Sequence, residues 1–109
     1  DLDPKVIQTD LIGVKMDWSS DGAILAVGGH RVMCSESDPG QIIFNNVLHF
    51  YSRSAFTDPA YEGTYVPPLK TVVLDFEQQP LSALTWGNAD RRFYVACGQL
   101  IYVGWVYAR

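Results

Sequence analysis

Residues 14–29 read VKMDWSSDGAILAVGG, and this stretch decides the fold. Apolar and polar residues alternate from Val14 to Trp18, which is the period-two pattern of a half-buried strand. Residues 19–22 are typical of a tight turn, because short side-chain oxygens bond nearby backbone and Gly tolerates a positive φ. Residues 23–27 form a continuous apolar run, as in a strand covered on both faces. The stretch therefore predicts strand, turn and strand.

The same plan recurs downstream, so the chain contains an internal repeat. LSALTW at 81–86 leads into a polar turn, GNAD at 87–90, and then into RRFYVACG at 91–98. Trp18 and Trp86 occupy equivalent places 68 positions apart (86 minus 18), and we expect both to pack in the core. Asp21, Gly22 and Asp90 belong to the two turns, where we expect the carboxylates to stabilise the turn.

The rest of the chain adds further short β-like segments and no helical periodicity. Residues 30–46 and 52–66 are rich in Pro, Gly and polar residues, which is typical of surface loops. The predicted strands are residues 5–9, 12–18, 23–29, 47–51, 70–76, 81–86, 91–98 and 100–107. Each connection is either too short for a crossover helix or rich in Pro and Gly, so we expect antiparallel sheets. We predict an all-β fold of two four-stranded units: residues 1–51 with an insertion at 30–46, a loop at 52–67, and residues 68–109.

Composition limits the classes of function. A hydrophobic content of 48% and an aromatic content of 13% over 109 residues indicate one packed domain. The net charge of −4 disfavours nucleic acid as a partner. No signal peptide is visible and no apolar run spans a membrane, so we expect no direct membrane insertion. The two cysteines, Cys34 and Cys97, indicate no oxidising compartment.

The order of these features resembles a known repeat family. Trp18-Ser19-Ser20-Asp21-Gly22 followed by Leu25-Ala26-Val27-Gly28 is similar to the core of a WD repeat, although the family's Trp-Asp dipeptide is absent. The resemblance implies a partial WD-repeat β-propeller made of two four-stranded blades. It is nearest to the last two repeats of the WD region in tubby-like proteins, and a ciliary WD-repeat protein is similar in the second half.

The resemblance implies a cytoplasmic protein–protein interaction scaffold. In one member of the tubby-like family the WD repeats precede a SOCS box and a tubby domain, and the SOCS box suggests an adaptor for a ubiquitin ligase. Neither lies within these 109 residues. The alternative implied by the second resemblance is a structural subunit of an intraflagellar transport complex, associated with the cilium.

No motif of an enzyme stands out. The chain has no Gly-x-Ser-x-Gly elbow, phosphate-binding Gly loop or His-Glu-x-x-His sequence. His30 and Cys34 are four positions apart but lack the second pair of a structural zinc site. We therefore expect no catalytic residue, cofactor or metal.

The aromatic residues of the second loop are the best candidates for partner binding. They are Phe56, Tyr61 and Tyr65. Loops carry binding residues more often than core strands do, and Tyr is enriched at interfaces. The alternative is that each folds back onto the edge of the sheet.

Two repeat units leave apolar faces open. Repeats stabilise one another through contacts with their neighbours. We expect this chain to be a piece of a longer intracellular protein, in which it lies against other blades of the same propeller or associates with other copies.

Overall fold

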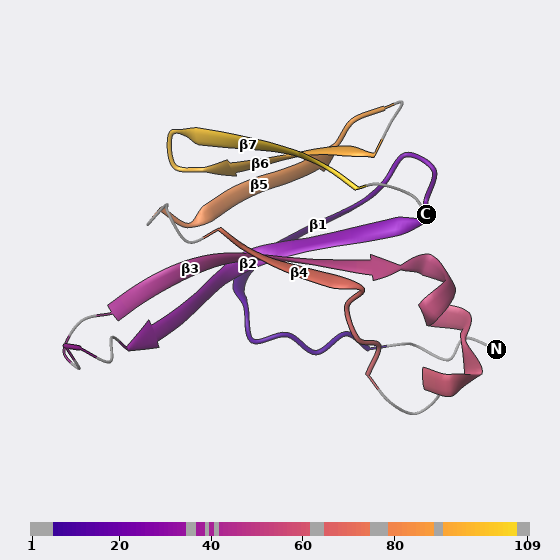
Figure 1. Cartoon of the computed structure of the whole chain (residues 1–109), viewed down its shortest axis with the longest axis horizontal. Coiled ribbons are helices and arrows are strands. Elements are labelled where there is room, and N and C mark those ends of the chain that lie inside the picture. The colour runs from indigo at the N-terminus through magenta and orange to yellow at the C-terminus, as the bar shows by residue number, and fades with distance from the viewer. Residues whose placement is uncertain are drawn as a thin grey trace.

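The computed structural model describes residues 6–34, 37–38, 40, 42–61, 65–74, 79–88 and 91–106, and within them the chain is all-β (Figure 1). It contains two antiparallel sheets, one with the strand order β1-β2-β3-β4 and one with the order β5-β6-β7. No α-helix occurs in these residues. The strands are β1 Ile12–Trp18, β2 Ile24–Cys34, β3 Ile42–Ser52, β4 Lys70–Leu74, β5 Leu81–Trp86, β6 Arg92–Cys97 and β7 Leu100–Trp105; the 3-10 helices are η1 Arg53–Thr57 and η2 Pro59–Tyr61.

The two repeats are equivalent at the level of strand pairing. Trp18 ends β1 and pairs with Leu25, the second residue of β2. Trp86 ends β5 and pairs with Phe93, the second residue of β6. The predicted strand, turn and strand around Trp18 is therefore confirmed, as are the two strands that flank the second turn, of which residues 89 and 90 lie outside the described residues.

The predicted insertion at 30–46 is largely strand. β2 continues to Cys34 and β3 begins at Ile42, and these two strands pair along their whole length, from Ile24↔Ser52 to Cys34↔Ile42. The sequence suggested a loop there because the polar turn residues 35–40 dominate the composition. Pairing with a partner of equal length satisfies the backbone of the flanking residues, which then extend as a hairpin.

The fourth strand of the first sheet lies within the range that the sequence assigns to the second unit. β4 pairs with β3 from Asn46↔Leu74 to Phe50↔Lys70, and Leu69 N donates to Phe50 O at 2.6 Å. Within the described residues the first sheet therefore has four strands and the second has three, in place of the two four-stranded units predicted. The chain returns to β3 because the free edge of that strand otherwise exposes unpaired backbone groups.

The prediction of a strand at residues 5–9 is wrong for residues 6–9, which are the described part of that range. Residues 6–11 are irregular, and Val66 N donates to Val6 O at 3.4 Å. Within this segment Ile7 covers part of the first sheet instead. Ile7 packs beside Leu25, Val27 and Tyr51 on that surface.

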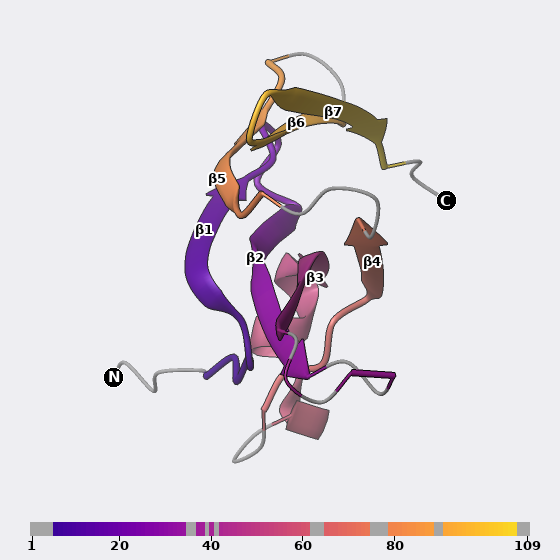
Figure 2. The same cartoon turned by 90° about the vertical axis from the view of Figure 1, so that its left-hand side faces the viewer.

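The two sheets pack face to face, with β5 beside β1 and β2 (Figures 1 and 2). We call the face of the first sheet that meets β5 its back face and the opposite face its front face. The core between the sheets is apolar: Ile24, Ala26, Leu48, Phe50, Leu74, Leu81, Leu84, Trp86, Val95 and Cys97. At Gly28 a Cβ would lie 2.8 Å from Leu81 Cδ1 and 2.9 Å from Leu48 Cδ2. The absence of a side chain there lets the two sheets approach closely.

The front face of the first sheet is covered by its own chain. The predicted loop at 52–67 contains η1 and η2, which lie beyond the end of β3 (Figure 1). Phe56, Tyr61 and Val66 pack against Leu25 and Tyr51 there. The molecule therefore has two apolar clusters, one between the sheets and one under the 3-10 helices.

Asn46 joins the two sheets through a fully buried amide. Its Nδ2 donates to Gln79 O at 2.7 Å, and its Oδ1 accepts from Leu81 N at 2.8 Å. These bonds fix the chain where it passes from the first sheet into β5. A buried side chain that satisfies two backbone groups is costly to remove.

We predict that Asn46→Ala lowers the free energy of unfolding by about 2–4 kcal/mol, because each buried group left without a partner costs about 1–3 kcal/mol. Chemical denaturation followed by tryptophan fluorescence measures this change. Ser82→Ala is the matched control, since it removes an exposed side-chain bond to Ala96 O. Equal losses for the two variants would contradict the role given to Asn46.

Candidate functional site

The first repeat turn is held by its own side chains. Ser19 Oγ donates to Asp21 Oδ1 at 2.6 Å, and the same carboxylate oxygen accepts from Ala23 N at 3.1 Å. Ile24 N donates to Ser19 Oγ at 3.1 Å. Gly22 has a φ of 71°, a conformation that other residues rarely adopt. The turn therefore needs Ser, Asp and Gly at these positions.

Asp21 also reaches the second sheet. Arg91 Nη2 lies 3.0 Å from Asp21 Oδ2. The Ser19 hydroxyl, then the Ala23 N–H and then Arg91 stabilise the ionised form and lower the Asp21 pKa to about 2. The carboxylate is thus charged and bonded at neutral pH. Its predicted role in the turn is consistent with this geometry, and Asp90 lies outside the described residues.

Asp17 makes a further polar contact between the repeats. Trp86 Nε1 donates to Asp17 O at 2.8 Å, and Trp86 N donates to Asp17 Oδ2 at 3.2 Å. Trp86 itself is only 7% exposed. No sequence pattern indicated this contact, because a polar residue in an alternating strand is expected to face solvent.

Trp18 does not share the burial of its counterpart. It is 44% exposed, although the repeat predicts core packing for both. Its ring meets Phe56 edge-on, with the centroids 6.1 Å apart. Trp86 is buried because it faces the back of the first sheet. Trp18 points to the front face, where no second sheet lies among the described residues.

Arg53 lies beside Trp18 at the start of η1. A Cβ at Gly22 would lie 3.4 Å from Arg53 Nη1, so the guanidinium lies over this glycine. Trp18, Gly22 and Arg53 line a hollow of about 330 Å³. The described residues place no carboxylate within ion-pair distance of Arg53.

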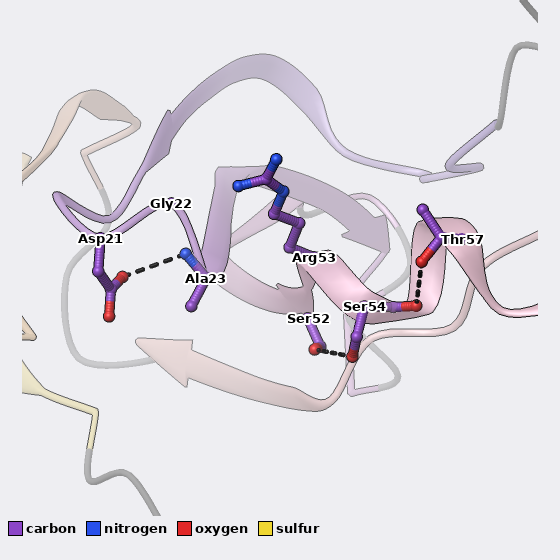
Figure 3. A pocket seen from close by; sticks show the side chains of 7 residues that line it. All are labelled: Asp21, Gly22, Ala23, Ser52, Arg53, Ser54 and Thr57. Atoms are coloured by element: carbon purple, nitrogen blue, oxygen red, sulfur yellow. Dashed lines mark hydrogen bonds between the residues drawn. The ribbon is translucent and has the colours of Figure 1, made fainter.

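A second hollow adjoins the first across Gly22 and Arg53. It has a volume of about 420 Å³, and Figure 3 shows its lining residues. The hydroxyls are already occupied, since Ser52 Oγ lies 2.8 Å from Ser54 Oγ and Thr57 Oγ1 donates to Ser54 O. The Arg53 guanidinium and the Asp21 carboxylate point away from each other (Figure 3).

The three aromatic residues predicted for partner binding have different surroundings. Phe56 and Tyr61 are half-buried and pack against the front cluster, which is the alternative that we allowed for them. Tyr65 is 57% exposed. Of the three, Tyr65 alone presents most of its ring to solvent, so it is the candidate contact residue.

Tyr65 borders a groove of about 700 Å³. The groove is lined by Gln8, Thr9, Asp10, Arg31, His49, Tyr51, Tyr65, Val66, Pro67 and Pro68. Arg31 Nε lies 2.8 Å from Asp10 Oδ2, and the hydrogen bond from Arg31 holds the Asp10 pKa below its usual value. Burial lowers the pKa of His49, whose Nδ1 lies 2.8 Å from Thr71 Oγ1. The lining of the groove therefore combines aromatic rings, prolines and one ion pair.

The outer face of the second sheet exposes several apolar side chains. Ile101 is 70% exposed, and Val103 and Trp105 are about half exposed. Arg92 lies over the Trp105 ring, with its Cζ 5.4 Å from the centroid. The equivalent face of the first sheet is the back face, which the second sheet covers.

Metal and membrane features are not found in the part of the chain described. No three His, Cys, Asp or Glu residues there are grouped so as to hold a metal ion. The same residues form no helix of the length and hydropathy that crossing a membrane requires. The side chain of Cys34 lies outside the description, and Cys97 is buried in the core between the sheets.

The fold and these surfaces define an all-β module of two packed antiparallel sheets. The chain is similar to Tubby-related protein 4 of Mus musculus and to Tubby-related protein 4 of Homo sapiens, each 30% identical over 105 residues. The match covers 94% of this chain and 6% of either relative. No family profile and no solved structure matches the chain. The predicted resemblance to a tubby-like protein is confirmed at this level of similarity.

We predict that Ser19→Ala raises the pKa of Asp21, because the Ser19 hydroxyl is the main cause of its depression. A carboxyl whose pKa is lower in the folded chain stabilises the fold at pH values above its unfolded pKa of 3.8. This stabilisation is lost as the pH falls from 3.8 towards the folded pKa of about 2. NMR titration of the Asp21 carboxyl carbon measures the pKa. Asp58→Asn, a change at an exposed residue of the η1–η2 connection, serves as the control and leaves the pKa unchanged. An Asp21 pKa that is the same in the wild-type and Ser19→Ala chains would disprove this role of the Ser19 hydroxyl.

Proposed function

We propose that this chain is a non-catalytic protein–protein interaction module. In this proposal its two sheets are blades of a WD-repeat propeller in a cytoplasmic adaptor similar to Tubby-related protein 4. The adaptor would present substrates to a ubiquitin ligase through a SOCS box outside these residues. The similarity over 94% of the chain supports the comparison with that relative.

The observation that carries the proposal is the open face of the second sheet. Ile101, Val103 and Trp105 form a row of exposed apolar side chains along β7. The equivalent face of the first sheet is covered by a neighbouring sheet in this same molecule. A face of this kind is stabilised when another sheet or protein lies against it.

The groove at Tyr65 supports a second contact with a partner. Its walls combine an exposed Tyr, two prolines and an Arg–Asp pair. Tyr and Arg are enriched among residues that dominate binding energy at interfaces. The groove lies on the front side, so a partner bound there leaves the β7 face accessible to a neighbouring sheet.

We predict that the isolated chain self-associates at micromolar concentration and that Ile101→Lys combined with Val103→Lys reduces this association. Both side chains are exposed, so the double change removes apolar contact area and adds repulsion while leaving the core unchanged. Light scattering after size-exclusion chromatography gives the mass, and denaturation checks the fold. A wild-type chain that stays monomeric at all concentrations would count against the proposal.

We predict that Tyr65→Ala weakens partner retention about fivefold or more without changing stability, because an interface Tyr contributes about 1 kcal/mol or more. Quantitative pull-down with the wild-type and variant chains measures retention. Phe56→Ala is the contrasting variant, and we expect it to lower stability because Phe56 packs against Tyr51. If Tyr65→Ala retained the same proteins at the same level, the groove would have no role in recognition.

A further inference from the structure

The contact that Trp86 makes inside the molecule shows what a repeat Trp binds when a neighbour covers it. Its indole N–H donates to the main-chain carbonyl of Asp17, and its backbone N–H donates to the carboxylate of that residue. Arg91 then binds the Asp21 carboxylate of the same hairpin. An extended strand ending in an acidic turn therefore satisfies a Trp and an Arg together.

Trp18 and Arg53 present the same two chemical groups without such a neighbour. Trp18 is equivalent to Trp86 in strand register, yet its ring remains exposed and its indole N–H makes no hydrogen bond within the described residues. Arg53 shares a hollow with Trp18 and has no carboxylate partner in that part of the chain. Phe56 supports the Trp18 ring from one edge, which holds it in place.

We propose that the hollow of Trp18, Gly22 and Arg53 binds an extended acidic segment of a partner protein. The segment presents a main-chain carbonyl to the Trp18 indole N–H and an Asp or Glu carboxylate to the Arg53 guanidinium. A cation without a bonded acid attracts a carboxylate strongly, since charge-assisted hydrogen bonds are stronger than neutral ones. Trp and Arg are also the residue types most enriched at the energetic centres of interfaces.

A second copy of this chain is a poor occupant. The segment that would be offered, residues 14–22, already uses Asp17 and Asp21 to bind Trp86 and Arg91 within its own molecule. Presenting it to another copy requires opening the packed sheets. A second copy is therefore disfavoured, and the occupant in this proposal is a segment of a different protein that carries an acidic residue beside an extended stretch.

The inference rests on the proposed function and names the chemistry of a partner. The experiment that tests it is separate from the mass measurement that tests the β7 face. The probe is a capped peptide with the sequence of residues 14–22 in which Phe replaces Trp18, so that the peptide adds no indole signal. NMR of the 109-residue chain follows the three indole N–H resonances during the titration. We expect the Trp18 resonance to shift and the Trp86 resonance to stay, because Trp86 is already bonded to Asp17 O.

Matched variants make the test decisive. Arg53→Gln and Trp18→Phe are each expected to weaken peptide binding at least about tenfold, as is a peptide with Asn in place of both Asp residues. Arg53→Lys retains the charge and is expected to recover part of the affinity, and added salt weakens binding. Tyr65→Ala, at the separate groove, leaves binding unchanged.

Three outcomes would overturn the inference. The first is that the chain does not bind the peptide at millimolar peptide concentration, and the second is that Arg53→Gln binds the peptide as tightly as the wild-type chain. The third is that the mass of the chain depends on concentration and that Trp18→Phe abolishes this dependence, which would place a second copy at this surface. Denaturation of each variant confirms that it is folded. A failed titration leaves the β7 face and its mass measurement as an independent test of the interaction module.

Discussion

The packing of β5 against the back of the first sheet is the contact on which the rest of the structure depends. It buries Trp86 and Leu81 against β1 and β2, and it requires the missing side chain at Gly28 for close approach. Apolar burial supplies the driving force, at roughly 25 cal/mol per Å² of area removed from water. Asn46 and Asp17 add hydrogen bonds that fix how the sheets meet. Without this contact each sheet has one apolar face in water.

The two copies of the repeat have different surroundings. Trp86 lies in the core, while Trp18 lies at the surface beside Arg53. The front face of the first sheet is partly covered by η1 and η2, whereas the outer face of the second sheet exposes Ile101 and its neighbours. The molecule therefore has two chemically different ends, one aromatic and cationic and the other apolar. This asymmetry suits a module that contacts two unlike neighbours.

Similarity to Tubby-related protein 4 extends along nearly the whole chain, although the chain spans only 6% of the length of that relative. The proposed function rests on exposed surfaces, namely the row along β7 and the groove at Tyr65. Two carboxylates of the described residues make structural contacts: Asp21 binds the turn and Arg91, and Asp10 binds Arg31. In the proposed function, recognition depends on exposed side chains such as Tyr65 and Trp18.

The sequence by itself determined the strands and the turn chemistry, because alternation at 14–18 and the Ser19–Gly22 turn depend on neighbouring residues. It also located the repeat and proposed Tyr65 as a contact residue. Only the tertiary structure decided which sheet β4 joins and which Trp is buried. Two strands with the same sequence pattern do not reveal which element packs against each of their faces. Asp17, Asn46 and Arg53 were missed for the same reason. The residues beside them in space are distant in sequence. Packing between the sheets, together with the return of the chain at η1, brings them close.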